Sequence, residues 1–365
     1  MDDQIVSTSS RQRVALRMAT LGVAAALRLP DRVIRAIVGA PVQVEGAQLS
    51  PTAQLLIALE RAVPRAAPNV VPDLVAVRRD FDIASSVLLA GVGRDVQVRD
   101  TVVNGAHGPI PARVYSPPGA SGPLPLLVFF HGGGFVLGSL TSHDGICRFL
   151  SEHGGVRVVA VEYALAPEHP YPAGVEDTYA AFRHIASNAE HFGGVDGVVG
   201  VGGDSAGGAL SAVVAQRCVD EAVPKPAFNL MLYPAVDGLS EHRSRQLFGS
   251  GFFLNSEVVD WYRACYTQDL TRLLEPYASP LRSPDFRGLP PTCVVTGGFD
   301  LFRDEGTEYA DRLRAAGVEV THLHHDGLVH GFASFLACDR HARQAMWAAA
   351  AELRRMAAVA REPSS

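Results

Sequence analysis

The segment GVVGVGGDSAGGALSA, residues 197–212, places a serine between a run of glycine and valine and a run rich in alanine. The first run predicts a strand and the second a helix. Gly203 and Gly207 lie two positions on either side of Ser205, in the pattern G-x-S-x-G. Between a strand and a helix, this pattern predicts a tight turn that exposes the serine hydroxyl. Ser205 is therefore the candidate nucleophile.

Similar apolar runs recur along the chain and alternate with segments of helical length. The predicted strands are 125–130, 156–163, 197–203, 228–234, 292–298 and 319–324. The predicted helices are about 141–153, 174–190, 206–221, 304–316 and 332–357. Near-continuous apolar strands that alternate with helices are typical of an α/β protein whose mostly parallel sheet is covered on both faces.

Two regions fall outside this alternation. Residues 1–95 have helical spacing, as in SPTAQLLIALERAV from Ser50, where a proline takes the first helical position. Residues 96–365 form the predicted catalytic domain, which opens with the strand-like runs VQVRDTVV and PARVYSP. About residues 236–278 interrupt that domain with a helical, aromatic insertion. We expect the insertion and the N-terminal region to form a helical cap over the strand ends, where ligands of such sheets bind.

Composition and charge exclude several classes of protein. The chain has 365 residues and a net charge of −6, which argues against a nucleic-acid partner. Its five cysteines are scattered without a C-x-x-C pair, which predicts free thiols and a cytoplasmic location. No segment has the roughly 20 apolar residues of a spanning helix. The apolar stretch 18–30 is expected to be an amphipathic helix on the body, with a membrane-surface contact as the alternative.

A nucleophilic serine needs a base and an orienting carboxylate, expected in the order Ser, Asp, His. Asp300 follows the strand TCVVTGG, and His330 follows the strand EVTHLH and the loop HDGLV. Both therefore lie near strand ends. Asp304 and Glu305 are rival carboxylates, but they fall in the expected first turn of a helix, where acids are common. We predict a catalytic triad of Ser205, Asp300 and His330.

A histidine cluster precedes His330. His322, His324 and Asp326 fit the start of a metallo-hydrolase pattern, H-x-H-x-D, but Gly327 stands where that pattern requires another histidine. His322 and His324 share one face of a strand, so that their proximity needs no metal to explain it. We expect these residues and His325 to be structural, and the protein to use neither metal nor organic cofactor.

Three consecutive glycines follow another predicted strand, in LPLLVFFHGGGFVLGS, residues 124–139. Backbone N–H groups stabilise the oxyanion formed when a carbonyl is attacked, provided that they can approach it closely. Glycine permits this approach and the unusual dihedral angles that accompany it. The predicted oxyanion-hole donors are the N–H groups of Gly132, Gly133 and Ala206, the residue after the nucleophile.

Together these motifs resemble the hormone-sensitive-lipase-like carboxylesterases of the α/β-hydrolase superfamily. The resemblance runs from about Asp95 to the C-terminus. It rests on HGGGF at 131–135, YALAPEHPYPAG at 163–174, GDSAGG at 203–208, DLFRDEG at 300–306, AGVEV at 316–320 and HGF at 330–332. It implies an α/β-hydrolase fold with a helical cap, the same triad and oxyanion hole, and ester hydrolysis through an acyl-enzyme intermediate.

The sequence departs from the family at three places. Ala164 stands in place of Arg, Ala209 in place of Asn, and Leu301-Phe302 in place of Pro-Leu. We expect none of these residues to touch a catalytic atom.

The expected substrates are small, uncharged esters with short to medium acyl chains. Four aromatic residues of the insertion are candidates for the substrate pocket: Phe252, Phe253, Trp261 and Tyr262. The sequence leaves open a homodimer, an amide or lactone hydrolase that uses the same triad, a membrane-surface lipase, and a non-catalytic protein that binds a small ligand.

Overall fold

The computed structural model describes residues 10–62, 73–239 and 241–362. Parts of the predicted N-terminal region (1–9 and 63–72) and one residue of the predicted insertion (240) lie outside these ranges. The described chain is built around an eight-stranded sheet in the order β10-β9-β8-β7-β5-β6-β4-β3. The strands are β3 Gln97–Gly105, β4 Gly108–Ser116, β5 Leu124–Phe130, β6 Arg157–Val161, β7 Gly194–Asp204, β8 Asn229–Leu232, β9 Thr292–Phe299 and β10 Val320–Val329.

The sheet is mostly parallel. Strands β10, β9, β8, β7, β5 and β6 run in one direction, whereas β4 pairs antiparallel with both β6 and β3. The interior strands are continuous apolar runs because both faces are covered, and every residue of β9 is buried. These observations confirm the predicted α/β architecture, including the strand-like runs that open the second region. All six parallel strands end at one edge of the sheet.

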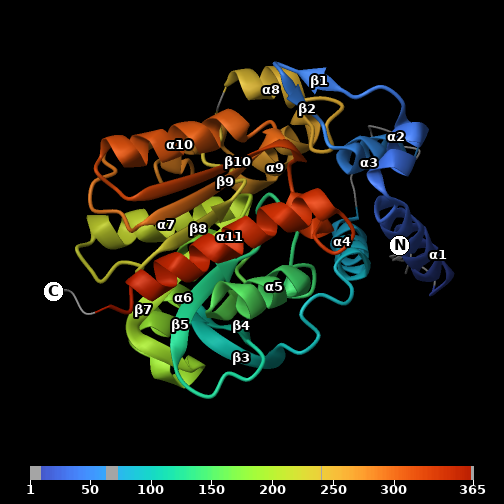
Figure 1. The fold of residues 1–365 in the computed structure, drawn as a ribbon. Coiled ribbons are helices and arrows are strands. Elements are labelled where there is room, and N and C mark those ends of the chain that lie inside the picture. Colours follow the sequence, from blue (N-terminus) through green and yellow to red (C-terminus); the bar gives the residue numbers. More distant parts are fainter. Residues whose placement is uncertain (1–9, 63–72, 240, 363–365) are drawn as a thin grey trace, which may run out of the picture.

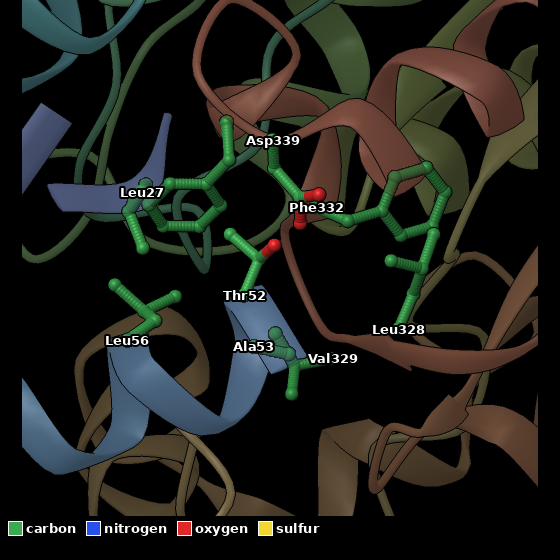
Figure 2. Close-up of a pocket in the computed structure, with 9 residues that line it drawn as sticks. Leu27, Thr52, Ala53, Leu56, Leu328, Val329, Phe332 and Asp339 are labelled. Atoms are coloured by element: carbon green, nitrogen blue, oxygen red, sulfur yellow. The ribbon is translucent and has the colours of Figure 1, made fainter. Parts of the chain in front are cut away.

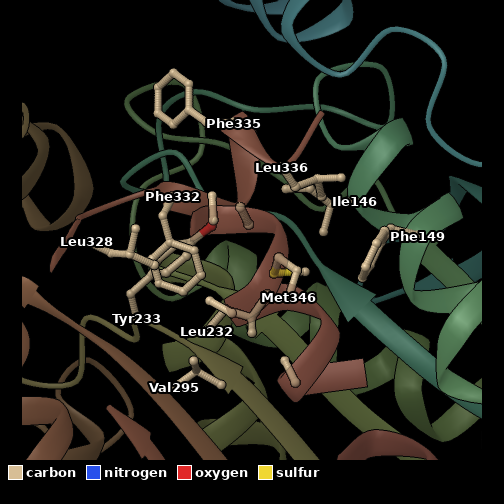
Figure 3. Packing of buried hydrophobic residues seen from close by; sticks show 14 of the residues in the cluster. Ile146, Phe149, Leu232, Tyr233, Val295, Leu328, Phe332, Phe335, Leu336 and Met346 are labelled. Atoms are coloured by element: carbon tan, nitrogen blue, oxygen red, sulfur yellow. The ribbon is translucent and has the colours of Figure 1, made fainter. Parts of the chain in front are cut away.

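Helices cover both faces (Figure 1). Helices α5 Asp144–Gly154 and α11 Arg340–Val359 pack together on one face. Helices α6 Ala173–Ser187, α7 Ala206–Asp220 and α10 Arg303–Ala315 pack on the other. Figure 3 shows the core beneath α11, where Met346 lies above Leu232 and Val295 of the sheet, with Ile146 of α5 nearby. This packing fixes the strand ends in place.

The final helix differs from its prediction. The structure has a short 3-10 turn, Phe332–Phe335, and α11 begins only at Arg340. Asp339 starts the helix, because its side chain accepts a hydrogen bond of 2.8 Å from the N–H of His341. The apolar pattern continues through the turn and the helix alike, so periodicity alone did not locate the break.

The described N-terminal elements are mainly helical. They are α1 Ser10–Leu27, α2 Asp31–Val38, β1 Gln43–Val44, β2 Ala47–Gln48, α3 Pro51–Ala62 and α4 Leu74–Leu88. In α1, Ala24 and Leu27 are buried, while Val14 and Met18 are more than half exposed. This helix therefore packs on the body along one side only. No helix among the described residues is long and apolar enough to cross a membrane.

Part of this region supports the loop that follows β10. The N–H of Ser50 donates to the carbonyl of Gly327 at 2.9 Å. Figure 2 shows Thr52 and Ala53 of α3 beside Val329 and Phe332, around a small cavity of about 10 Å³. A cavity of this size has room for about one water molecule. The start of α3 thus packs against the chain on either side of residue 330.

The predicted insertion contains α8 Arg243–Phe248, α9 Ser256–Thr267 and a 3-10 helix, Leu270–Leu274. It contacts the N-terminal elements, which lie on the same side of the molecule in Figure 1. Arg61 of α3 donates to the carbonyl of Gly251 at 3.2 Å, and Glu45 forms an ion pair with Arg243. Two regions far apart in sequence therefore meet beside the ends of the parallel strands.

The approach of α7 to β5 depends on a glycine. A Cβ on Gly207 would overlap the backbone oxygen of Phe130, whereas a Cβ on Gly22 of α1 would meet no atom within 4 Å. We expect Gly207→Ala to lower the free energy of unfolding by about 3 kcal/mol or more, since a backbone must move to make room. The matched control Gly22→Ala should raise it by roughly 0.5–1 kcal/mol through helix propensity.

Urea denaturation followed by circular dichroism measures both changes. Equal stability of Gly207→Ala and the parent protein would contradict the close packing described here.

Candidate active site

Ser205 occupies the turn between β7 and α7 in a strained conformation, with φ 53° and ψ −118°. A residue other than glycine rarely adopts such a conformation unless its surroundings impose it. The N–H of Ser205 donates to the carbonyl of Leu232 at 2.9 Å, and the N–H of Ala235 donates to the carbonyl of Ser205 at 3.2 Å. A Cβ on Gly203 would collide with the backbone of Phe130 and Gly207. The turn therefore requires glycine at positions 203 and 207, and its hydrogen bond to Leu232 of β8 fixes its position.

The structure brings Ser205, His330 and Asp300 together from the ends of three strands. His330 Nε2 lies 2.9 Å from Ser205 Oγ, and His330 Nδ1 lies 2.8 Å from Asp300 Oδ2. Asp300 is 1% exposed, and its Oδ1 accepts a hydrogen bond of 2.8 Å from the N–H of Phe302. Because that bond fixes the carboxylate, Asp300 can orient the imidazole ring toward the serine.

The rival carboxylates are engaged elsewhere. Asp304 pairs with Arg303 at 2.7 Å and accepts from the N–H of Ser244 at 2.8 Å. Glu305 Oε1 accepts from the N–H groups of Val236 and Asp237. Neither forms a hydrogen bond with His330 in the described structure, so Asp300 is the carboxylate that the fold presents to the histidine.

In the glycine loop after β5, the structure contradicts one of the predicted oxyanion donors. The N–H of Gly132, predicted to be an oxyanion donor, already donates to Asp204 Oδ1 at 2.8 Å. The N–H groups of Gly133, Gly134 and Ala206 donate to no acceptor among the described residues. Gly133 and Gly134 both have positive φ, 117° and 63°. Gly134, which sequence reasoning left out, therefore replaces Gly132 as a candidate donor. Because all three residues are glycine, the sequence does not indicate which of their N–H groups is already hydrogen-bonded.

Asp204 anchors this loop beside the nucleophile, a role that sequence reasoning did not assign. Its Oδ1 lies 3.2 Å from His143 Nε2, and its Oδ2 accepts from the Tyr233 hydroxyl at 3.3 Å. Burial works to raise the pKa of Asp204, but the His143 ring and the Gly132 N–H hold it below its ordinary value. Asp204 is thus an ionised acceptor that joins the loop after β5 to the residue before Ser205. Its place in GDSAGG was the only available signal.

His131, the first residue of the loop, is also structural. Burial lowers its pKa to about 3, so the ring is neutral. It stacks on Tyr163 with ring centroids 4.4 Å apart, and the Tyr163 hydroxyl donates to the His131 carbonyl at 2.7 Å. These contacts hold the entrance of the glycine loop.

The four aromatic candidates occupy different places. The Tyr262 ring lies against Gly134, where a Cβ would overlap it, and Trp261 packs beside Tyr262. Phe253 lies near Gly331 and contacts Phe335. Phe252 packs on Phe248 and Phe299. Tyr262 and Phe253 therefore touch loops that carry the site, whereas Phe252 fills the space between the insertion and β9.

Phe302 shows that one expectation was wrong. This departure from the family pattern was expected to touch no catalytic atom, yet its N–H donates to Asp300 Oδ1 at 2.8 Å and its ring meets the His330 ring edge-on, with centroids 5.2 Å apart. The Tyr233 ring meets the same histidine from another side at 5.0 Å. The two aromatic rings restrict the motion of the imidazole.

The histidines before His330 share a threonine. His322 Nε2 and His324 Nδ1 each lie 2.9 Å from Thr296 Oγ1, and His324 also lies 3.2 Å from Asp326. Within residues 10–62, 73–239 and 241–362, no group of three or more His, Cys, Asp or Glu side chains is arranged to hold a metal ion. His322 and His324 thus act as a polar pair on β10.

Comparison with known proteins supports the resemblance. A family model described as the alpha/beta hydrolase fold matches residues 127–334. The chain is 42% identical over 300 residues to the carboxylic ester hydrolase LipN of Mycobacterium tuberculosis. The aligned residues cover 80% of this chain and 79% of that protein. It is 39% identical to the carboxylesterase NlhH of the same organism, over 62% of this chain and 72% of that protein.

Solved structures agree. The ester-hydrolase EH1AB1 from the metagenome of Lake Arreo is 40% identical, with a TM-score of 0.81 over 84% of this chain and 98% of its own. The hyperthermophilic esterase of the archaeon Pyrobaculum calidifontis is 37% identical, with a TM-score of 0.80 over 85% of this chain and 99% of its own. The strained serine turn, the ordered triad and these similarities lead to one conclusion: the chain belongs to the α/β-hydrolase family, in its hormone-sensitive-lipase-like group.

Proposed function

We propose that this carboxylic ester hydrolase cleaves esters of short- to medium-chain acids through an acyl-enzyme intermediate on Ser205. One observation carries the proposal: His330 bridges Ser205 and Asp300 with contacts of 2.9 and 2.8 Å. This is the arrangement of nucleophile, base and orienting acid that acyl transfer requires. Relatives named as a carboxylic ester hydrolase, an esterase and a carboxylesterase, at 37–42% identity, support the same reaction class.

In the proposed mechanism, His330 Nε2 accepts the Ser205 proton as the oxygen attacks the ester carbonyl. The N–H groups of Gly133, Gly134 and Ala206 stabilise the oxyanion. The intermediate collapses, and the alcohol leaves with the proton from His330. A water molecule, deprotonated by the same histidine, then attacks the acyl-enzyme. The bond between the acyl carbon and Ser205 Oγ breaks, His330 returns the proton to Ser205 Oγ, and the acid is released. Asp300 fixes the imidazole tautomer and stabilises the imidazolium throughout.

The insertion and the N-terminal elements form the proposed cap. The contacts that support it are Arg61 to Gly251 and Glu45 to Arg243, which join the two regions beside the strand ends. Tyr262, against the glycine loop, and Phe253, beside Gly331, line the proposed acyl pocket. Bulky rings so close to the site favour short and medium acyl chains over long ones.

The experiment that tests this function uses p-nitrophenyl esters of graded chain length with the parent protein and Ser205→Ala. We expect rapid hydrolysis of short and medium chains by the parent, and a loss of roughly 10⁶-fold in kcat in the variant, because the nucleophile is removed. Hydrolysis that survives in Ser205→Ala would contradict the assigned nucleophile. A folded parent that cleaves none of these esters would instead point to an amide, a lactone or simple ligand binding.

A second prediction concerns the carboxylate. Asp300→Asn should lower kcat by about 10⁴-fold, because the amide favours the wrong imidazole tautomer. Asp304→Asn is the matched control: its carboxylate pairs with Arg303, so kcat should stay within a few-fold of the parent value. The values of kcat for both variants are measured by steady-state kinetics with the ester that the parent hydrolyses fastest. A larger loss in Asp304→Asn than in Asp300→Asn would mean that the wrong carboxylate has been assigned.

A third prediction concerns the anchor of the glycine loop. Asp204→Ala leaves the Gly132 N–H without its acceptor, and should lower kcat by roughly 10²-fold with little change in KM, since oxyanion donors act in the transition state. Asp204→Asn keeps an oxygen acceptor and should retain more activity. Thermal melts show whether each variant folds. A folded Asp204→Ala with the parent kcat would show that the loop does not depend on this contact.

A further inference from the structure

Three polar side chains meet where the insertion packs on the catalytic domain: Arg245 of α8, Arg263 of α9 and Glu305 of α10. Each has a buried atom with no hydrogen-bond partner among the described residues, namely Arg245 Nε, Arg263 Nη2 and Glu305 Oε2. The Glu305 side chain is 0% exposed and that of Arg245 is 10% exposed. A buried polar atom without a hydrogen-bond partner lowers the free energy of unfolding by about 1–3 kcal/mol. Three such atoms in one place indicate that the cluster binds a ligand that supplies the missing hydrogen bonds.

The remaining contacts do not satisfy these atoms. Arg245 Nη2 lies 3.6 Å from Glu305 Oε2, which is too long for a hydrogen bond, and donates instead to the Asp237 carbonyl at 3.3 Å. Arg263 pairs through Nη1 with Asp260, whose side chain is 67% exposed. Each guanidinium therefore keeps a buried N–H group free of any described acceptor.

The charges in this cluster are unbalanced. Two guanidinium groups face one fully buried carboxyl group, since Asp237 is paired with Arg282 at 2.9 Å and Asp260, the partner of Arg263, is 67% exposed. Burial raises the pKa of Glu305 to about 8, which leaves that carboxyl group largely protonated at neutral pH. Burial and the neighbouring Arg245 lower the pKa of Arg263. An added anion would relieve the repulsion between the two arginines.

The cluster is separated from the triad by one or two residues. The guanidinium of Arg245 lies 5.2 Å from the centre of the Phe302 ring, and that ring also meets the His330 ring edge-on. Glu305 accepts from the N–H of Val236, and the preceding residue, Ala235, donates to the carbonyl of Ser205. On α9, Arg263 follows Tyr262, which packs on the glycine loop. Arg245 and Glu305 thus contact residues that themselves contact His330 or lie next to a residue bonded to Ser205.

We propose that Arg245 and Arg263 bind a free carboxylate of the substrate, so that the preferred substrates are monoesters of short dicarboxylic acids. The inference rests on the proposed esterase function and deepens it. A carboxylate can accept from both guanidinium groups in charge-assisted hydrogen bonds, for which arginine is well suited. It would also supply the negative charge that the cluster lacks. This assignment departs from the uncharged esters expected from the sequence.

The test compares the p-nitrophenyl monoester of glutaric acid with p-nitrophenyl pentanoate, which has the same chain length without the charge. We expect the parent to favour the glutarate ester by about 10-fold or more in kcat/KM, the effect of a charge-assisted hydrogen bond. Arg263→Gln should reduce this preference by about 10-fold, and Arg263→Lys should retain part of it. Arg272→Gln is the matched control, because Arg272 also belongs to the insertion but pairs with Glu275 at 2.9 Å. It should leave the preference unchanged.

A second pair of substrates distinguishes the acyl side from the alcohol side. Acetate esters of 4-hydroxybenzoate and of 4-methylphenol place the carboxylate, or its neutral counterpart, on the leaving group. A preference for the charged member of this pair alone, again lost in Arg263→Gln, would keep the arginine site but overturn its assignment to the acyl chain.

The outcomes separate this inference from the proposed function. A folded parent that cleaves neither glutarate nor pentanoate ester contradicts the esterase itself. Two results would overturn the carboxylate site. One is a parent that cleaves the pentanoate ester and shows no preference for either charged ester. The other is a preference that survives in Arg263→Gln, and in both cases the arginines would be part of a structural ion-pair cluster only. Should Arg263→Gln fail to fold, competitive inhibition of the parent decides: the monoamide of glutaric acid, which carries one carboxylate, should inhibit about 10-fold more tightly than pentanamide, which carries none. Equal inhibition by the two amides would overturn the site.

Discussion

The close approach of α7 to the end of β5 is the constraint on which the site depends. Gly203 and Gly207 leave room for the backbone of Phe130, and the turn between them forces Ser205 into positive φ. The first N–H of α7, that of Ala206, is thereby presented beside the serine hydroxyl. Larger residues would push the helix away and relax the turn. The candidate nucleophile and one candidate oxyanion donor thus come from a single packing contact.

Around that contact, each reactive group is held by a neighbour with no chemical role of its own. Asp204 ties the glycine loop after β5 to the residue before Ser205. Phe302 and Tyr233 enclose the His330 ring, and α3 packs on the chain around it (Figure 2). These contacts preorganise the site, which matters because a displacement of about 1 Å can cost a factor of 100 in rate. The N-terminal region therefore supports the histidine as well as meeting the insertion.

The insertion adds a feature of a different kind. Apolar side chains of the insertion, among them Phe248 and Phe252, pack in the core cluster, yet the largely buried side chains of Arg245 and Arg263, 10% and 19% exposed, belong to the same insertion. A fold gains little stability from a poorly paired buried charge, and removal of such groups in other proteins is often neutral or stabilising. A role in recognising substrate gives these arginines a physical reason to be there.

The sequence by itself determined the features that lie within one contiguous segment: the parallel strands, the serine turn, and the strand-end positions of Asp300 and His330. Apolar periodicity and glycine spacing are local properties, so that a single chain reports them directly. Only the tertiary structure decided which glycine N–H is already taken by Asp204, that Phe302 meets His330, and that Arg245, Arg263 and Glu305 converge. Those facts depend on distances between residues far apart in the chain, and hydrogen bonding and burial arise only when the fold brings them together.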